Sequence, residues 1–135
     1  MYELHEYEQY FFDQATLNRL TRFLAQYTAI CCVCAPVLGK ALVEAGKVVT
    51  ILDVDERFAT IPGYQRWDLY RPQWLSQHLD IIVCDPPFFK VSLSQLFASI
   101  RILSHNNFEQ PILLSYLRRR SPTTSRRCLK VASLG

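Results

Sequence analysis

IIVCDPPFF, residues 81–89, is the stretch from which the fold of this chain can be inferred. Its first four residues are apolar without alternation, which is typical of a parallel strand that is buried on both faces. The two prolines that follow cannot donate hydrogen bonds to a sheet and have a fixed φ, so we expect the strand to end at Asp85. A carboxylate and an aromatic ring then follow the carboxyl end of a strand, which is where ligands bind in open α/β sheets.

The segment from Asp85 to Phe88 has the chemistry to hold an amine. Asp85 and the backbone carbonyl of Pro86 are acceptors for the two N–H bonds of an NH2 group, and Phe88 offers a face for stacking. Pro87 stiffens the segment. The alternative interpretation is a strand followed by an ordinary proline turn, because Asp and Pro are common turn residues.

The rest of the sequence alternates between strand-like and helix-like segments. Strands are predicted at residues 29–36, 48–58, 64–68, 81–85 and 111–117, and helices within residues 7–27, 37–46 and 91–104. This alternation predicts an α/β fold with a doubly wound parallel sheet. Asp53, Asp68 and Asp85 then stand at the carboxyl ends of successive strands. A crevice lined by three carboxylates suits a ligand with hydroxyls, an amino group and a positive charge.

The second strand and the first loop indicate which class of nucleotide would fit. Asp53 stands where a ribose-binding acid is expected, with Asp55 as a competing candidate, although residues 55–57 could simply form a solvated turn. The loop CAPVLGKAL, residues 34–42, lacks the GxGxxG fingerprint. A pyrophosphate needs that glycine cradle, so a dinucleotide-dependent oxidoreductase is disfavoured, whereas S-adenosylmethionine has no phosphate and is compatible with this loop.

The composition indicates one domain of ordinary size. Of 135 residues 50% are hydrophobic, and we find neither an apolar run long enough to span a membrane nor a signal sequence. We therefore expect a cytoplasmic protein without a membrane partner. Four of the five cysteines lie in apolar strand-like runs, and the CCVC spacing is not a zinc pattern, so we expect reduced thiols and no metal site. All 12 acidic residues precede Leu117, whereas six of the 15 basic residues follow it.

Five short motifs occur in the order QYFFDQAT, CVCAPVL, LDVDERF, WD and DPPF between about Tyr7 and Leu117. In this order and spacing the sequence resembles the probable N6-adenine methyltransferase-like family. The resemblance implies a Rossmann-like class I methyltransferase sheet, S-adenosylmethionine as cofactor, and methyl transfer to an amino group. One branch of that family contains lysine methyltransferases of elongation factor 1-alpha, and another contains zinc-knuckle methyltransferases that modify adenine in ribosomal RNA.

The resemblance also implies roles for individual residues. Phe12 and Thr16 would border the methionine end of the cofactor, and Cys34, Ala35 and Pro36 would form its loop. Asp53 would hold the ribose hydroxyls, Trp67 and Asp68 would contact the adenine ring and its amino group, and Asp85, Pro86, Pro87 and Phe88 would hold the target amine. Simpler interpretations remain open for two of them, because Thr16 could only support the start of a helix and Trp67 could belong to the core.

The acceptor is the least determined part of this interpretation. Phe88 favours a stacked base, and hence adenine in nucleic acid, because base–aromatic stacking is sequence-tolerant and favourable. A phenylalanine can equally line a lysine channel, so a lysine in a translation factor is the alternative, and the chain has no zinc knuckle. A third possibility is a remnant without catalytic activity, or a nucleic-acid-binding protein that uses its basic tail.

Residues 118–135, RRRSPTTSRRCLKVASLG, depart most from the family pattern, in which a further helix and strands follow the fifth strand. They are polar and basic without periodicity, so we expect them not to fold. This divides the chain into a methyltransferase domain, residues 1–117, and a disordered basic tail. We therefore expect a truncated or frameshifted product after Leu117, a sheet that lacks its last strands, and an exposed apolar edge at the fifth strand that favours self-association.

Overall fold

A computed structural model describes residues 13–85, 92–119 and 125–132 of the chain. Within these residues the helices are α2 (Gln14–Leu24), α3 (Pro36–Glu44) and α4 (Leu93–Leu103), with a 3-10 turn, η1 (Glu56–Phe58). The strands are β1 (Ile30–Val33), β2 (Val49–Asp53), β3 (Tyr64–Arg66), β4 (Ile81–Cys84), β5 (Ile112–Arg119) and β6 (Ser125–Ala132). None of the described helices is long and apolar enough to cross a membrane.

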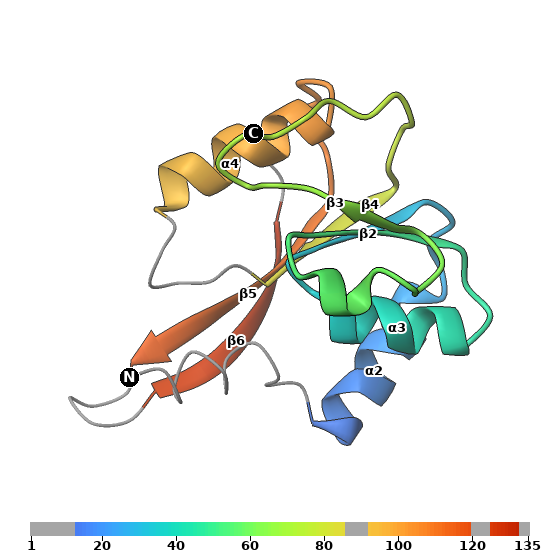
Figure 1. Ribbon diagram of the computed structural model, residues 1–135. Helices are drawn as coiled ribbons and strands as arrows, with labels where there is room; N and C mark the ends of the chain where they lie inside the picture. Colours follow the sequence, from blue (N-terminus) through green and yellow to red (C-terminus); the bar gives the residue numbers. More distant parts are fainter. Residues whose placement is uncertain (1–12, 86–91, 120–124, 133–135) are drawn as a thin grey trace.

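The strands form one sheet in the order β3-β2-β1-β4-β5-β6. The first five run parallel to one another, and β6 pairs antiparallel with β5. The chain moves outward from β1 to β2 and β3, then crosses back to β4 on the other side of β1 (Figure 1). This reversal creates a topological switch point between β1 and β4, and the predicted α/β fold with a doubly wound parallel sheet is confirmed.

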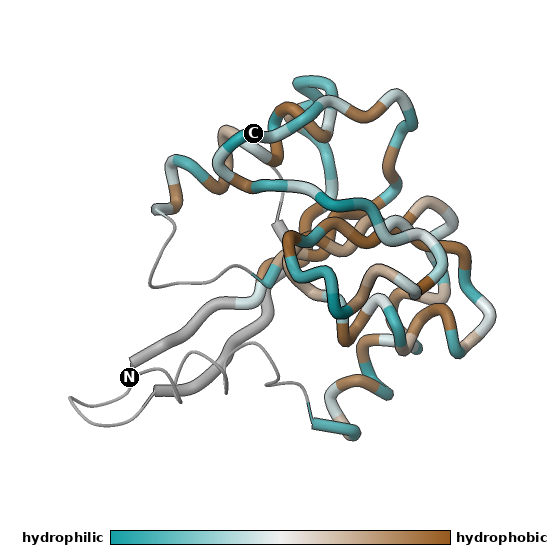
Figure 2. The backbone as a smooth tube through the Cα atoms, viewed as in Figure 1, coloured by the Kyte–Doolittle hydropathy of each residue, from teal (hydrophilic) through white to brown (hydrophobic). Residues whose placement is uncertain are grey.

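Helices cover both faces of the sheet, so the core has two halves. Ile30 and Cys32 of β1 pack with the apolar residues of α2 and α3, whereas Cys31 and Val33 pack with those of α4. This alternation follows from the period of two residues in a strand. Figure 1 shows α4 on one side of the sheet and α2 and α3 on the other, and Figure 2 shows hydrophobic residues concentrated in the central strands.

Local sequence signals explain where the helices begin. Asp13 caps α2 by accepting the backbone N–H of Thr16 at 2.7 Å. Pro36 is the first residue of α3, where its missing N–H costs nothing, and not the last residue of a strand as we expected. The strand predicted at 48–58 is shorter for a similar reason, because Asp55 caps η1.

The prediction for the carboxyl-terminal segment is wrong for the residues that the structure describes. Residues 125–132, expected to be disordered, form β6 and pair with β5 along its full length, from Ile112↔Ala132 to Arg119↔Ser125. The physical reason is the open edge of β5, whose unpaired backbone groups are a template for another strand. Consequently β5 is not the exposed edge that we expected, and the sheet is extended by one antiparallel strand.

Candidate active site

The carboxyl ends of four parallel strands bring the predicted site residues to one edge of the sheet. Asp53 is the last residue of β2, and Asp85 follows β4 directly. Cys34 follows β1, and Trp67 and Asp68 follow β3. These strands are neighbours in the order β3-β2-β1-β4, so residues from distant parts of the chain meet at the switch point.

Cys34 lies in the middle of this edge. Burial raises the pKa of its thiol, and the carboxylates of Asp53, Asp85 and Asp68 raise it further, in that order. All three acids are therefore close enough to the sulfur to act on it electrostatically. The Cys34 backbone N–H donates to the Leu52 carbonyl at 2.9 Å, and its φ of 56° lies in the left-handed region, where a residue with a Cβ is uncommon and marks a constrained turn.

Asp53 is fixed by its neighbours on both its carboxylate and its backbone. Its Oδ1 accepts the Asp55 backbone N–H at 2.8 Å, while its carbonyl accepts the Tyr64 hydroxyl at 3.0 Å and the Trp67 backbone N–H at 3.1 Å. Burial is the largest influence on its pKa and raises it. A half-buried carboxylate held in this way is suited to accept hydrogen bonds from a ligand hydroxyl.

Asp55, the competing candidate, is engaged elsewhere. Its Oδ2 lies 2.6 Å from Nη2 of Arg57, and its Oδ1 accepts the Arg57 backbone N–H at 3.0 Å. The side-chain hydrogen bond to Arg57 is the main cause of the lowered pKa of Asp55. This pairing favours Asp53 as the acid that faces a ligand.

The two predicted residues after β3 differ in their surroundings. Trp67 is only 4% exposed, packs in the same half of the core as α4, and donates its Nε1–H to the Gln73 carbonyl at 3.1 Å. Its position favours the core interpretation over contact with a ligand ring. Asp68 is half-buried, and its Oδ1 accepts the Tyr70 backbone N–H at 2.9 Å.

Asp85 is 6% exposed, and its backbone N–H donates to the Val33 carbonyl at 3.1 Å, which fixes it beside the end of β1. Ala35 and Pro36 are buried at the start of α3. Thr16 lies in the first turn of α2, where its backbone N–H is bound by Asp13, so its position favours the helix-start interpretation. The remaining predicted site residues, Phe12, Pro86, Pro87 and Phe88, lie outside the described residues.

Sequence reasoning missed the residues that hold the loop after β3. Ser99 of α4 is fully buried and donates from Oγ to the Leu69 carbonyl at 2.6 Å, and Gln95 Nε2 donates to the same carbonyl at 3.2 Å. Leu69 follows Asp68 directly, so α4 positions the third carboxylate. The sequence signal that could have indicated this contact is the pair Gln95 and Ser99, two polar residues four positions apart on an otherwise apolar helix face.

A model of the family described as "Probable N6-adenine methyltransferase" matches residues 3–133. The chain belongs to this family. The match includes β6, so the family pattern extends further along the chain than the five motifs indicated. No curated protein matches the sequence significantly.

Solved methyltransferase structures share the fold of this family member. A glycopeptide N-methyltransferase, MtfA, superposes with a TM-score of 0.59 at 13% identity, over 87% of this chain and 67% of that one. Magnesium protoporphyrin IX methyltransferase from Synechocystis PCC 6803, with bound SAM, superposes with a TM-score of 0.57 at 18% identity, over 79% of this chain and 60% of that one. The chain thus spans about two thirds or less of the length of these proteins. The predicted Rossmann-like class I methyltransferase fold is confirmed.

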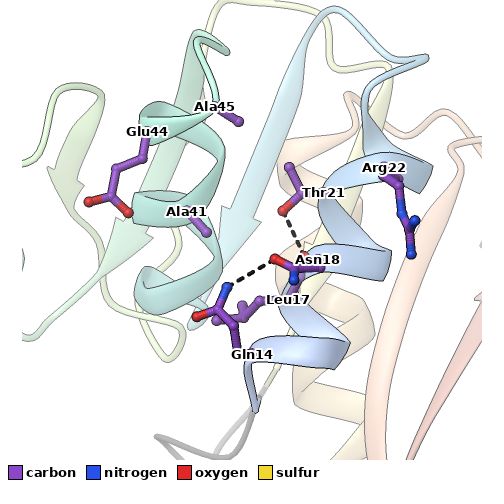
Figure 3. Close-up of a pocket in the computed structure, with 8 residues that line it drawn as sticks. All are labelled: Gln14, Leu17, Asn18, Thr21, Arg22, Ala41, Glu44 and Ala45. Carbon is purple, nitrogen blue, oxygen red and sulfur yellow. Dashed lines mark hydrogen bonds between the residues drawn. The ribbon is translucent and has the colours of Figure 1, made fainter.

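A hollow is formed between α2 and α3 (Figure 3). It has a volume of about 570 Å3 and is lined by Gln14, Leu17, Asn18, Thr21, Arg22, Ala41, Glu44 and Ala45. Gln14 is engaged with Asn18 at 2.9 Å, and the Thr21 hydroxyl donates to the Leu17 carbonyl at 2.7 Å. None of the predicted site residues lines it. Among the described residues, no cluster of three or more His, Cys, Asp or Glu side chains could hold a metal ion.

The chemistry of the carboxylate edge fits the cofactor implied for this family. Three acidic side chains suit a ligand that carries hydroxyls, amino groups and a positive sulfonium. The loop between β1 and α3 has no glycine cradle, which a pyrophosphate would require. The site therefore fits a phosphate-free nucleoside better than a dinucleotide.

Proposed function

We propose that this protein is an S-adenosylmethionine-dependent N-methyltransferase that acts on an amino group held beside Asp85. The observation that carries the proposal is the convergence of Asp53, Asp68 and Asp85 around Cys34 at the switch point of the sheet. Membership of the probable N6-adenine methyltransferase family supports the same chemistry. Three of the similar structures hold S-adenosylmethionine, which supports the choice of cofactor.

Different residues at this edge of the sheet bind different parts of the cofactor. Asp53 accepts the ribose hydroxyls, because its half-buried carboxylate stands at the end of β2 and Asp55 is occupied by Arg57. Asp68 accepts the amino group of the adenine ring. The turn from Cys34 to Pro36 lets the ligand approach the backbone between β1 and α3. When bound, the cofactor supplies a methyl group on a positively charged sulfur.

Asp85 acts on the acceptor. A carboxylate that accepts an N–H bond fixes the nitrogen and directs its lone pair, and such alignment provides most of the rate enhancement expected for a direct displacement. The β4 strand and the bond from the Asp85 N–H to Val33 hold the residue rigidly. For an adenine, accepting N–H bonds also draws the lone pair out of conjugation. For a lysine, the buried surroundings of Asp85 would favour the uncharged amine that the reaction needs.

We favour adenine in nucleic acid as the acceptor and regard a protein lysine as the competing substrate. The description of the family supports adenine, as does the aromatic residue Phe88 in the sequence next to Asp85.

The test combines cofactor binding with methyl transfer. In calorimetry with S-adenosylmethionine, Asp53→Asn should abolish binding, whereas the control Asp55→Asn should leave it unchanged. Asp85→Asn should retain cofactor binding but lose transfer of labelled methyl groups to adenine-containing RNA or DNA. The absence of cofactor binding by the folded protein would overturn the proposal, and label found only in protein would replace adenine with lysine.

A further inference from the structure

The strands β5 and β6 reach beyond the rest of the sheet on the side of the candidate active site. In the β4–β5 register Cys84 lies opposite Leu114, so Asp85 and Ser115 stand at the same level. The β5 strand continues to Arg119, and β6 accompanies it over this whole extension. At about 3.3 Å per residue, Arg118 lies about 10 Å beyond the level of Asp85. Figure 1 shows this hairpin extending past the other strands.

Arg118, Arg119, Arg126 and Arg127 belong to this extension, and Lys130 of β6 lies opposite Leu114, at the level of Cys84. We define the basic hairpin by the five positions Arg118, Arg119, Arg126, Arg127 and Lys130 of β5 and β6. No acidic residue occurs after Glu109, so the charge of this segment is not balanced along the sequence. Asp53, Asp68 and Asp85 belong to the other part of the chain, so the acidic ends of β2, β3 and β4 are separate in sequence from the basic extension.

The strand register places basic positions next to one another along the hairpin. Arg118 is the direct cross-strand partner of Arg126, and Arg127 lies opposite Leu117. Such a row of basic positions suits a polyanion, because Arg and Lys attract phosphates and bound counterions are released.

We propose that the basic hairpin binds the sugar–phosphate backbone of a single-stranded nucleic acid and so presents an adenine to Asp85. The proposal rests on the proposed function in its choice of adenine. The hairpin and Asp85 lie at the same edge of the sheet, so one flexible strand can contact both. Such backbone contacts position the nucleic acid without reading its sequence.

The experiment measures binding without the cofactor. A short fluorescent single-stranded RNA of mixed sequence, and DNA of the same sequence, are titrated with the protein over a series of salt concentrations. Affinity should fall steeply with salt, with a slope of about 0.7 per phosphate contact. In Arg118→Gln/Arg126→Gln the slope should decrease by about 1.4 and the affinity should fall for every sequence alike. The matched control Arg22→Gln/Lys40→Gln removes two exposed charges from α2 and α3 and should leave the slope unchanged.

The outcomes separate this proposal from the proposed function. Circular dichroism and S-adenosylmethionine binding should be unchanged in the hairpin variant, which shows that it is folded. The proposal is overturned if the unmodified protein shows no salt-dependent binding to either oligonucleotide, or if hairpin and control variants lose the same amount. Binding to anionic phospholipid vesicles without binding to nucleic acid would also overturn it. Cofactor binding without nucleic-acid binding would leave the methyltransferase proposal intact.

Discussion

Gly63→Ala should destabilise the protein severely, because it forces β3 away from β2. A Cβ at this position would lie 1.9 Å from the Val49 carbonyl oxygen and 3.1 Å from its carbon, both of which belong to the backbone of β2. No side-chain rotation can relieve such an overlap. The 2.9 Å hydrogen bond from the Ile51 N–H to the Gly63 carbonyl would therefore lengthen or break.

The magnitude follows from two contributions. Gly63 has a φ of 90°, and a residue with a Cβ in the left-handed region costs about 1–2 kcal/mol. Losing a backbone hydrogen bond to Ile51, which is fully buried, adds about 1–3 kcal/mol. The sum, about 2–5 kcal/mol, is a large part of the roughly 5–15 kcal/mol that stabilises a typical domain.

Gly46→Ala is the matched control. Gly46 has nearly the same φ, 87°, but a Cβ there would meet nothing within 4 Å. It should therefore cost only the conformational part, about 1–2 kcal/mol. Urea unfolding followed by circular dichroism measures both variants. If Gly63→Ala loses no more stability than Gly46→Ala, the close approach of β3 to β2 is refuted.

Three further substitutions test the site. Ser99→Ala removes the hydrogen bond to the Leu69 carbonyl and should lower the free energy of unfolding, measured in urea, by about 1–2 kcal/mol. Because Leu69 follows Asp68, the same variant should also bind S-adenosylmethionine more weakly. An unchanged affinity for S-adenosylmethionine would contradict a role of Ser99 in positioning Asp68. Trp67→Phe removes the hydrogen bond to the Gln73 carbonyl and should lower the free energy of unfolding by about 1 kcal/mol. Its affinity for S-adenosylmethionine, measured by calorimetry, should be unchanged. A tenfold loss of that affinity would instead support contact between Trp67 and the adenine ring. Asp53→Asn should stabilise the protein at neutral pH, because burial raises the pKa of Asp53 and its ionised form is disfavoured by folding. In a pH series of unfolding curves this gain should disappear as the pH falls below the ordinary value of 3.8, and a gain that persists there would contradict this origin.

The sheet could be predicted because its signals are local. Apolar runs that end in Pro or Asp define the central strands. Because the carboxyl ends of parallel strands meet at one edge of the sheet, the sequence alone places Asp53, Asp68 and Asp85 together. The sequence left Asp53 and Asp55 as alternatives, and the contact of Asp55 with Arg57 favours Asp53. The left-handed turn at Cys34 gave no signal, since glycine usually occupies such a position.

The β6 strand could not be predicted from composition, because its partner is supplied by another part of the chain. The sequence of residues 125–132 is basic and weakly patterned, and strand propensity depends on the neighbour with which a strand pairs. The backbone of β5 provides that neighbour over eight registered pairs. The prediction of disorder from charge was therefore wrong for residues 125–132, because the open edge of β5 was available to pair with them.

The β6 strand both completes the sheet beside β5 and carries three of the basic-hairpin positions, so a test of nucleic-acid binding must keep the strand in place. Deleting residues 118–135 would remove all five positions of the basic hairpin, and it would also expose the apolar edge of β5. A loss of binding in that deletion could arise from aggregation as readily as from lost charge. Substitution of Arg118 and Arg126 by Gln removes two charges and leaves every backbone hydrogen bond of the ladder available, because the ladder uses main-chain groups alone. Urea unfolding should therefore show an unchanged stability for this variant, and a salt slope that falls in it but not in Arg22→Gln/Lys40→Gln is the result expected of a contact with phosphates.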